Sequence, residues 1–493
     1  MGLDNDADVT TTIAGPVPRK ARGDSTKASP YQVLAIVYAA ICLANLDLFV
    51  VNVGLPNIAR DFRGASLEDL SWILNGYAIA YAALLVFFGR LAERHRRDLS
   101  FLASVALFTV ASAACAMANS VETLVAFRVA QAAGAALMTP TSLGLLLASF
   151  PADKRAGAVR AWTAIGGFAA ALGPLVGGLL VTVSWRWIFT INVPIGLIAI
   201  LAGFLVLPPV PGHDAPRPNL WAALLVTGGI GALTFAIVKA NDWGWASVGI
   251  GASFALAIIL LALFVHHCLR SANPFVDPAL FQVPPFTGAA LAFAPYGAAF
   301  GAMLLSIALW QQTAWGWSAL KTGLGIAPGP LLVPITSLLF AGRLISRFGA
   351  AAVATAGAIF FATGPLLWAM TIGVEPGIGP VVGGMICTGV GVGLTFPTLM
   401  GIGTASLPPS SFATGSGVIT MIRQAAIAIG VAIFVAIIGT PLSLQERVEA
   451  YHRAWWIVTA LSLVSIIPTQ LIIGRRRSPR PVQNSSSSGG EST

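Results

Sequence analysis

The stretch QVLAIVYAAICLANLDLFVVN, residues 32–52, has the length and composition of a helix that crosses a lipid bilayer. A hydrocarbon core about 30 Å thick takes a helix of about 20 apolar residues. Lipid offers no hydrogen bonds, so the backbone must satisfy its own polar groups, as a helix does. This stretch therefore predicts a membrane helix with one charged residue in it, Asp47.

Thirteen further apolar runs follow, and almost every charged residue lies between them. Of the 493 residues, 56% are hydrophobic and 10% are charged. A soluble chain of this length has no interior large enough for so much apolar surface. We therefore expect an all-α integral membrane protein with fourteen spans. They are residues 32–52, 70–89, 99–118, 121–148, 157–183, 187–208, 219–240, 247–267, 286–310, 322–341, 349–371, 377–402, 414–438 and 452–473.

Lys and Arg are unevenly divided between the two sets of loops. If the N-terminus is cytoplasmic, the cytoplasmic segments hold 19 of the 28 and the outside loops hold 7, while Arg128 and Arg423 fall within spans. The positive-inside rule then places both termini in the cytoplasm of a multi-pass protein of the cell inner (plasma) membrane. The net charge of +9 is spread over short loops. It suits anionic lipid headgroups rather than nucleic acid.

Neither the segments outside the spans nor the cysteines and histidines form a pattern typical of an enzyme or a metal site. Residues 1–30 read as a cytosolic tail without a cleavable signal, and residues 475–493 as a disordered cytosolic tail. The four cysteines have no metal-type spacing, and the five histidines lie in loops or at span ends. The chain has no Gly-x-x-x-x-Gly-Lys-Ser/Thr loop for ATP. We expect no metal, no cofactor and no enzymatic activity.

Two short similarities relate the halves of the chain. Residues 89–94 (GRLAER) match residues 342–347 (GRLISR), and residues 137–144 (LMTPTSLG) match residues 394–401 (LTFPTLMG). Both pairs fall at equivalent points of two six-span units, and such parallel repeats with a substrate site between them are transporter architecture. We expect two six-helix bundles, residues 31–208 and 271–474, separated by a linker and two extra spans within residues 209–270.

Asp47 is the acidic residue that lies well inside a predicted span. A charge in the bilayer interior costs roughly 2.5–3.5 kcal/mol, so such a residue is a functional candidate. Arg128, about two turns into the fourth span, cannot lose its charge at any relevant pH and is the matching cation. We interpret Asp47 and Arg128 as a proton-coupling pair. The alternative is a structural Asp that hydrogen-bonds a neighbouring helix.

Other polar or small residues in the spans suggest a hinge and a substrate cavity. Gly173, Pro174, Gly177 and Gly178 permit close helix packing and a bend, which predicts a hinge against the pseudo-symmetric helix or generic membrane packing. Trp315 and Trp317 fit an interfacial aromatic belt better than a cavity. Arg423 is either a counterpart of Arg128 in the second half or a structural, snorkelling residue. Our candidates for the substrate cavity are Asn52, Gln131, Trp310, Gln311, Gln312 and Arg423.

These motifs together resemble the fourteen-span drug:proton antiporters of the major facilitator superfamily. Residues 46–56 (LDLFVVNVGLP) look like the family's first-span motif, and residues 89–94 like its loop motif after the second span. Arg128 with Gln131 is similar to the fourth-span motif, and residues 173–178 (GPLVGG) to the antiporter motif. Residues 185–196 (WRWIFTINVPIG) are the most distinctive match.

The resemblance implies proton-driven export of amphipathic drugs, antibiotics or toxic compounds by alternating access, without ATP and by a monomer. It assigns Gly89, Arg90, Glu93 and Arg94 to a cytoplasmic loop gate. The family usually has Asp where Glu93 stands, so this gate is expected to be tuned differently. Spans 7 to 14 lack the extra membrane acids of some dication exporters, which argues against dicationic substrates. The alternatives are a dedicated exporter of one endogenous metabolite or lipid, and a non-transporting membrane sensor or scaffold.

Overall fold

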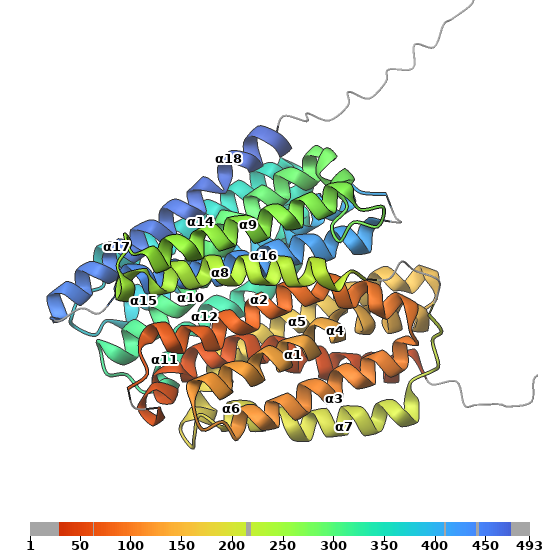
Figure 1. Cartoon of the computed structure of the whole chain (residues 1–493), viewed down its shortest axis with the longest axis horizontal. Helices are drawn as coiled ribbons and strands as arrows, with labels where there is room; N and C mark the ends of the chain where they lie inside the picture. Colours follow the sequence, from red (N-terminus) through yellow and green to blue (C-terminus); the bar gives the residue numbers. More distant parts are fainter. Residues whose placement is uncertain (1–28, 63, 213–217, 409–410, 440–442, 475–493) are drawn as a thin grey trace, which may run out of the picture.

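The computed structural model describes residues 29–62, 64–212, 218–408, 411–439 and 443–474. Within these residues every regular element is a helix (Figure 1). The predicted C-terminal tail, nearly all of the predicted N-terminal tail and Arg217 lie outside these residues. The prediction of an all-α fold is confirmed.

The first part of the chain forms one bundle. Its helices are α1 (Pro30–Asp61), α2 (Leu67–Arg94), α3 (Arg97–Ala116), α4 (Val121–Ser149), α5 (Ala152–Val181), α6 (Trp187–Thr190) and α7 (Asn192–Val206). A helical pair follows, α8 (Leu220–Trp243) and α9 (Val248–Arg270).

The remaining helices form the second bundle. They are η1 (Pro278–Gln282), α10 (Pro284–Thr313), α11 (Ala319–Ile326), α12 (Pro328–Ile335), η2 (Thr336–Ala341), α13 (Gly342–Phe348), α14 (Ala350–Thr371), α15 (Ile378–Ala405), α16 (Phe412–Ile438), α17 (Leu444–Val464), α18 (Ile466–Pro468) and η4 (Thr469–Ile473).

Thirteen helical stretches among the described residues are long and apolar enough to span a membrane. Helix α5 is the fourteenth long segment, with an apolar stretch over Leu172–Val181. The predicted spans thus correspond to helices, although several boundaries were wrong. The first span was expected to end at residue 52, but α1 continues through Pro56 to Asp61. A proline removes only one backbone donor, and neighbouring membrane helices compensate for that loss.

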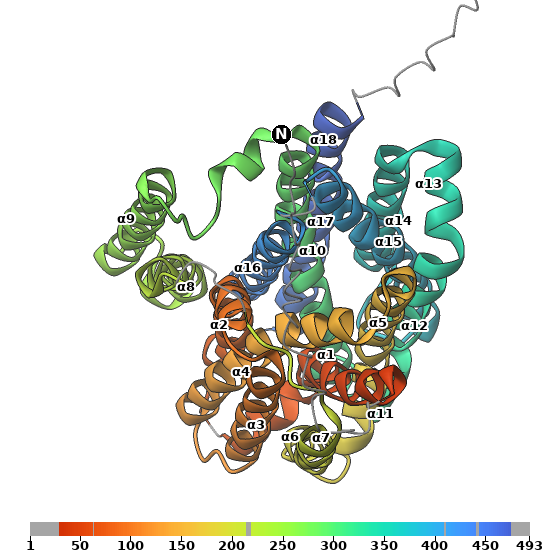
Figure 2. The same ribbon diagram turned by 90° about the vertical axis from the view of Figure 1, so that its right-hand side faces the viewer.

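The two bundles lie side by side, and α8 and α9 stand outside them. Figure 2, which looks along the helices, shows this pair at one edge of the molecule, beside α2 and α16. Helix α8 packs against both α2 and α16, whereas α9 packs mainly on α8. Most large side chains of α9 are exposed, among them Leu256, Ile258 and Ile259. Such a surface suits contact with lipid tails.

One end of the molecule, which we call the positive end, is where α1 begins and α2 ends, next to the arginines 90, 94, 96 and 97. At the opposite end the bundles are packed together. The Gln312 side chain of α10 donates to the Val53 carbonyl of α1 over 3.0 Å. A β-carbon on Gly178 of α5 would lie 2.7 Å from the Ala319 carbonyl oxygen of α11. At the positive end, by contrast, α13 has no buried residue.

Candidate functional site

Asp47 lies near the middle of α1, fully buried. Its Oδ2 atom forms an ion pair with Nη1 of Arg128 on α4. Its Oδ1 atom accepts a hydrogen bond from Nε2 of Gln131 over 2.9 Å and another from Nδ2 of Asn192 over 3.2 Å. The carboxylate therefore has a partner on each oxygen, and it joins three helices, α1, α4 and α7.

Arg128 is as completely enclosed as its partner, with 1% of its side chain exposed. Its Nε donates to the Ile73 carbonyl of α2 over 3.2 Å, and Nη1 also donates to Oε1 of Gln131 over 2.6 Å. The guanidinium carbon lies 4.1 Å from the centre of the Tyr77 ring, a cation–π distance. The Asp47 carboxylate, the two hydrogen-bond acceptors and the Tyr77 ring therefore compensate the charge of Arg128 within the protein.

Ser112 of α3 lies behind the ion pair and completes the network. Its hydroxyl accepts hydrogen bonds from Gln131 over 2.8 Å and from Asn192 over 3.3 Å, and donates to the Phe108 carbonyl over 2.7 Å. A proton that binds Asp47 changes the charge at the centre of a buried network drawn from five helices. Low dielectric surroundings make such networks sensitive to one charge.

Two members of the network were not singled out by the sequence reasoning. Asn192 stands inside residues 185–196, the motif most distinctive of the resembled family, and that motif was the available signal. Ser112 has no sequence signal, because an isolated serine in an apolar run is common. Gln131, assigned to the substrate cavity from the sequence, is fully buried and belongs to the Asp47 network.

Glu68 is a second buried acid that the span boundaries missed. It was expected before a span that begins at residue 70, but it lies in the first turn of α2 and is 1% exposed. Among the residues that the structure describes, neither carboxylate oxygen has a hydrogen-bond partner. The same holds for both side-chain polar atoms of Asn75, two helical turns further along the same face. Burying unpartnered polar groups is costly.

The antiporter motif packs tightly on both bundles. A β-carbon on Gly173 would lie 2.6 Å from the β-carbon of Phe49, and one on Gly177 would lie 2.9 Å from the Val50 carbonyl oxygen. Gly178 faces α11, and the Pro174 carbonyl lies against Gly323 of the same helix.

Helix α11 is not the helix that the internal repeat pairs with α5. The offset of 253 to 257 residues relates α5 to α16 and relates α2 to the segment of α11 to α13. The motif therefore packs against the counterpart of α2 rather than against its own pseudo-symmetric partner, which corrects our expectation.

The loop-gate residues lie at the positive end of α2. The Arg90 side chain donates a hydrogen bond to the Pro274 carbonyl, in the segment between α9 and η1. Gly89 has open space where a β-carbon would stand. Glu93 and Arg94 are partly exposed. One member of the motif thus joins the first bundle to the chain that leads into the second.

The remaining cavity candidates are placed differently from one another. Trp310 and Gln311 are fully buried, and Gln312 is used in the contact with Val53. Asn52 donates to the carbonyl one turn earlier in its own helix. Arg423 is partly exposed. Among these candidates, Arg423 is therefore the one that carries a formal charge and is also partly exposed, so that a ligand can reach it.

The two tryptophans expected at an interfacial belt differ in burial, since Trp317 is buried and Trp315 is partly exposed. Trp317 is 6% exposed, and the Trp315 indole donates to the Gly373 carbonyl over 2.9 Å. Belt residues present their rings to the headgroups. The belt interpretation is therefore wrong for Trp317, and for the partly exposed Trp315 it stays a prediction.

Helices α8 and α9 contain three charged residues that the sequence reasoning counted outside the membrane, namely Lys239, Asp242 and Arg270. Lys239 lies within α8 and pairs with Asp69 of α2 over 3.2 Å and with Asp242 over 3.0 Å. Asn219 caps α8 by accepting from the Ala222 amide over 3.1 Å. The pair of helices is therefore attached to the first bundle by an ion pair at the opposite end.

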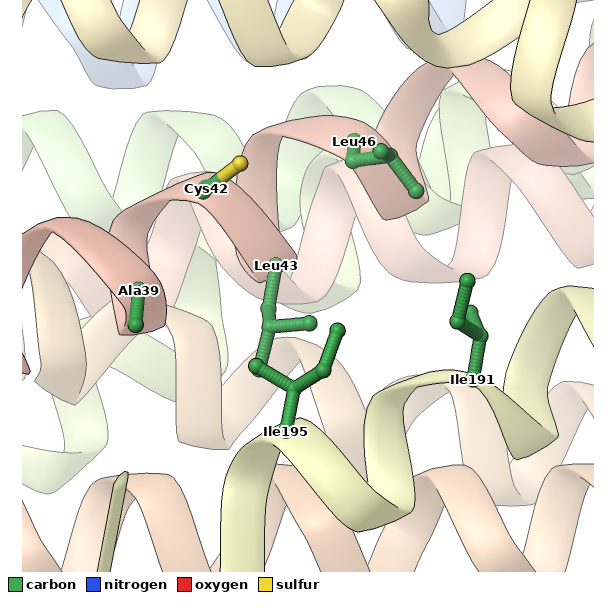
Figure 3. Close-up of a pocket in the computed structure, with 6 residues that line it drawn as sticks. All are labelled: Ala39, Cys42, Leu43, Leu46, Ile191 and Ile195. Atoms are coloured by element: carbon green, nitrogen blue, oxygen red, sulfur yellow. The ribbon is translucent and has the colours of Figure 1, made fainter. Parts of the chain in front are cut away.

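A small hollow lies between α1 and the α6–α7 segment. Figure 3 shows its lining, which is apolar throughout: Ala39, Cys42, Leu43, Leu46, Ile191 and Ile195. Substrate sites need a few polar groups to orient a ligand, so this hollow is not the site we develop. Across the part of the chain that the structure describes, no three His, Cys, Asp or Glu residues are grouped as a metal site would require.

A buried ion pair within membrane helices that form two repeated bundles is typical of a secondary transporter. A family model described as Major Facilitator Superfamily matches residues 37–431. The chain belongs to this superfamily, whose members are transporters rather than enzymes and use no cofactor.

Curated relatives and solved structures agree with this assignment. The tetracenomycin C resistance and export protein of Streptomyces glaucescens is 31% identical over 84% of this chain and 76% of the relative. The cephamycin export protein CmcT of Amycolatopsis lactamdurans is 29% identical over 91% of this chain and 93% of the relative. The predicted relationship to fourteen-span drug and antibiotic exporters is confirmed. The solved structure of an auto inhibited POT family peptide transporter matches this chain with a TM-score of 0.65. The match covers 92% of this chain and 98% of the transporter at 16% sequence identity, so it shows the fold alone.

Proposed function

We propose that this chain exports amphipathic drugs, antibiotics or other toxic compounds from the cytoplasm in exchange for protons, with Asp47 as the proton site. The superfamily assignment supports transport, and the two related export proteins, for tetracenomycin C and for cephamycin, support this kind of cargo. The observation that carries the proton coupling is the buried pair of Asp47 and Arg128.

The pair links a proton to the position of helices. When Asp47 binds a proton, its charge no longer compensates Arg128, which stays charged. A buried charge that has lost its partner is destabilised by roughly 3–5 kcal/mol. A rearrangement of α1 against α4 that rehydrates Arg128 relieves this cost. Proton binding therefore shifts the equilibrium between two arrangements of the bundle.

The rest of the proposal follows the sequence expectations. The positive end faces the cytoplasm and both termini lie there. Residues 31–208 and 271–474 are the two moving units, and residues 209–270 are an insertion outside the substrate path. Gly173, Pro174, Gly177 and Gly178 form the contact about which the units rock, and the protein works as a monomer.

Proton release from acid-loaded proteoliposomes tests the proposal. Purified full-length protein is reconstituted, a panel of toxic amphipathic compounds is added outside, and an internal pH dye reports proton efflux. We expect several compounds to induce release from vesicles with the native protein. Asp47→Asn keeps the size of the side chain without a titratable proton, so it should reduce release to the level of empty vesicles.

Asp61→Asn is the matched control, because it makes the same chemical change in a partly exposed ion pair with Arg186 at the end of α1. This variant should release protons as the native protein does. Substrate accumulation against a gradient by Asp47→Asn, with an unchanged dependence on pH, would show that Asp47 is not the coupling site.

A further inference from the structure

Arg423 lies between the bundles, near the middle of α16, and not on a lipid-facing surface. A β-carbon on Gly297 of α10 would lie 3.1 Å from the Arg423 carbonyl oxygen, so the backbone is packed against α10. The guanidinium carbon lies 5.5 Å from the centre of the Phe396 ring on α15. Helix α16 also packs along α2 of the first bundle. The partly exposed side chain therefore has the protein interior around it.

The charge of Arg423 has no counter-ion in the described residues. The side chain forms no hydrogen bond and no ion pair there, and its Nε atom is buried without a partner. The sequence from residue 284 to residue 443 has one acidic residue, Glu375, which is exposed between α14 and α15. A membrane charge is expensive unless a partner offsets it, and this half of the chain supplies none nearby.

A row of aromatic rings leads from the first bundle to Arg423. The ring centres of Phe49 on α1 and Phe300 on α10 are 6.2 Å apart, and those of Phe300 and Phe396 are 5.1 Å apart. These rings pack edge to face from α1 of the first bundle to α15 of the second, and Phe300 between them is buried. Phe49 and Phe396 are partly exposed. A planar aromatic guest therefore has ring partners on both sides of the seam between the bundles, with a fixed cation at one end.

We propose that Arg423 and the aromatic row of Phe49, Phe300 and Phe396 bind an aromatic acid, so that the exporter selects compounds that carry a carboxylate or phenolate on a fused ring system. This inference rests on the proposed export function and names its substrate class. The guanidinium offers two parallel donors to such an anion. A cationic guest is repelled by Arg423, and the Asp47 carboxylate does not offset this repulsion, because it is paired with Arg128.

Two xanthene dyes with the same three-ring system and opposite charge provide the test. Fluorescein is an anion with a carboxylate, and tetramethylrhodamine methyl ester is a cation. Binding to purified full-length protein in detergent is measured by fluorescence anisotropy, which needs no proton gradient. We expect the native protein to prefer fluorescein. Arg423→Gln should weaken fluorescein binding by roughly 10- to 100-fold, the range of a lost charge-assisted hydrogen bond, and leave the rhodamine unaffected.

Further variants separate charge, fold and ring contributions. Arg423→Lys keeps a cation and should lose less affinity than Arg423→Gln, which rules out a simple loss of folding. Arg343→Gln removes an exposed arginine of α13 and should change nothing. At equal ionic strength naphthoate should displace fluorescein and acetate should not. Displacement by acetate at the same concentration as naphthoate would overturn the aromatic part of the proposal.

Equal fluorescein affinity in the native protein and Arg423→Gln, or a native preference for the rhodamine, would overturn the assignment of the anion site. These results are distinguishable from failure of the export proposal. Rhodamine export with proton release would refute the aromatic-acid site alone. Tight, Arg423-dependent fluorescein binding without any proton-driven transport would refute the export mechanism alone.

Discussion

Arg128 in the first bundle and Arg423 in the second both lie within membrane helices, yet their surroundings differ. Arg128 has an ion pair, further hydrogen bonds and a ring against its face, and it is almost completely enclosed. Arg423 has one aromatic contact, no ion pair among the described residues, and partial exposure. The internal repeat does not relate them, since α4 corresponds to α15 and α16 to α5. The comparison indicates two tasks. A compensated charge responds to a proton on its partner, and an uncompensated charge is available to a ligand.

The largest difference should appear in stability. Arg128→Gln leaves Asp47 buried without its cation and should lower the free energy of unfolding by roughly 3–5 kcal/mol. Arg423→Gln removes a charge that has no partner, so it should be neutral or stabilising. Thermal unfolding of both purified variants in the same detergent, followed by tryptophan fluorescence, measures this. An equal loss in the two variants would contradict the distinction between a compensated and an uncompensated arginine.

Arg128→Lys tests whether the first site needs geometry as well as charge. Lys lacks the planar fork that reaches Asp47, Gln131 and the Ile73 carbonyl together. Losing one charge-assisted hydrogen bond costs about 1.5–3 kcal/mol, so we expect the export rate to fall by roughly 10- to 100-fold. Initial rates at matched expression provide the measurement. Near-native export would mean that only the positive charge matters at this site.

Gly178→Val tests the contact between α5 of the first bundle and α11 of the second. The added side-chain atoms would collide with the Ala319 carbonyl oxygen, at the end of the molecule opposite the positive end. Overpacking costs about 1–3 kcal/mol in the closely packed arrangement, which shifts the equilibrium between two arrangements by roughly 5- to 150-fold. Faster labelling of a cysteine placed at Leu320, in a background without the native cysteines, reports the shift. Gly251→Val on α9 is the control, because nothing lies within 4 Å of a β-carbon added there. Unchanged labelling in Gly178→Val would remove the hinge interpretation.

The smallest effect should come from the repeated loop motif. Arg90 donates to the Pro274 carbonyl beyond the first bundle, whereas Arg343 donates to the Leu339 carbonyl of its own helical segment. One partly exposed hydrogen bond contributes about 1 kcal/mol, so Arg90→Ala should slow export by a factor of roughly five. Arg343→Ala should leave the rate unchanged. Transport rates that fall equally in both variants would show that the two copies of the motif act alike.

The amino-acid sequence by itself determined the number of spans, the helical class and the pairing of one membrane acid with one membrane arginine. These follow from local physics, since about 20 apolar residues suffice to cross a bilayer and a charge among them is costly wherever its helix stands. Residues 32–52 show both features, since they form an apolar stretch of membrane-spanning length that contains the charged residue Asp47. The helix ends were less well predicted, because packing carried α1 through Pro56 and placed Glu68 inside the protein.

Only the tertiary structure decided which polar residues meet. Asn192 and Ser112 enter the Asp47 network from helices far away in sequence. The motif around Asn192 marked its segment but not this contact, and nothing near Ser112 in the sequence marks it. Helix α5 packs on α11, the counterpart of α2, because the two bundles meet along different helices from those that the repeat aligns. The contrast between Arg128 and Arg423 has the same origin. A charge is compensated by what lies within a few ångströms in space, and residue spacing along the chain does not contain that distance.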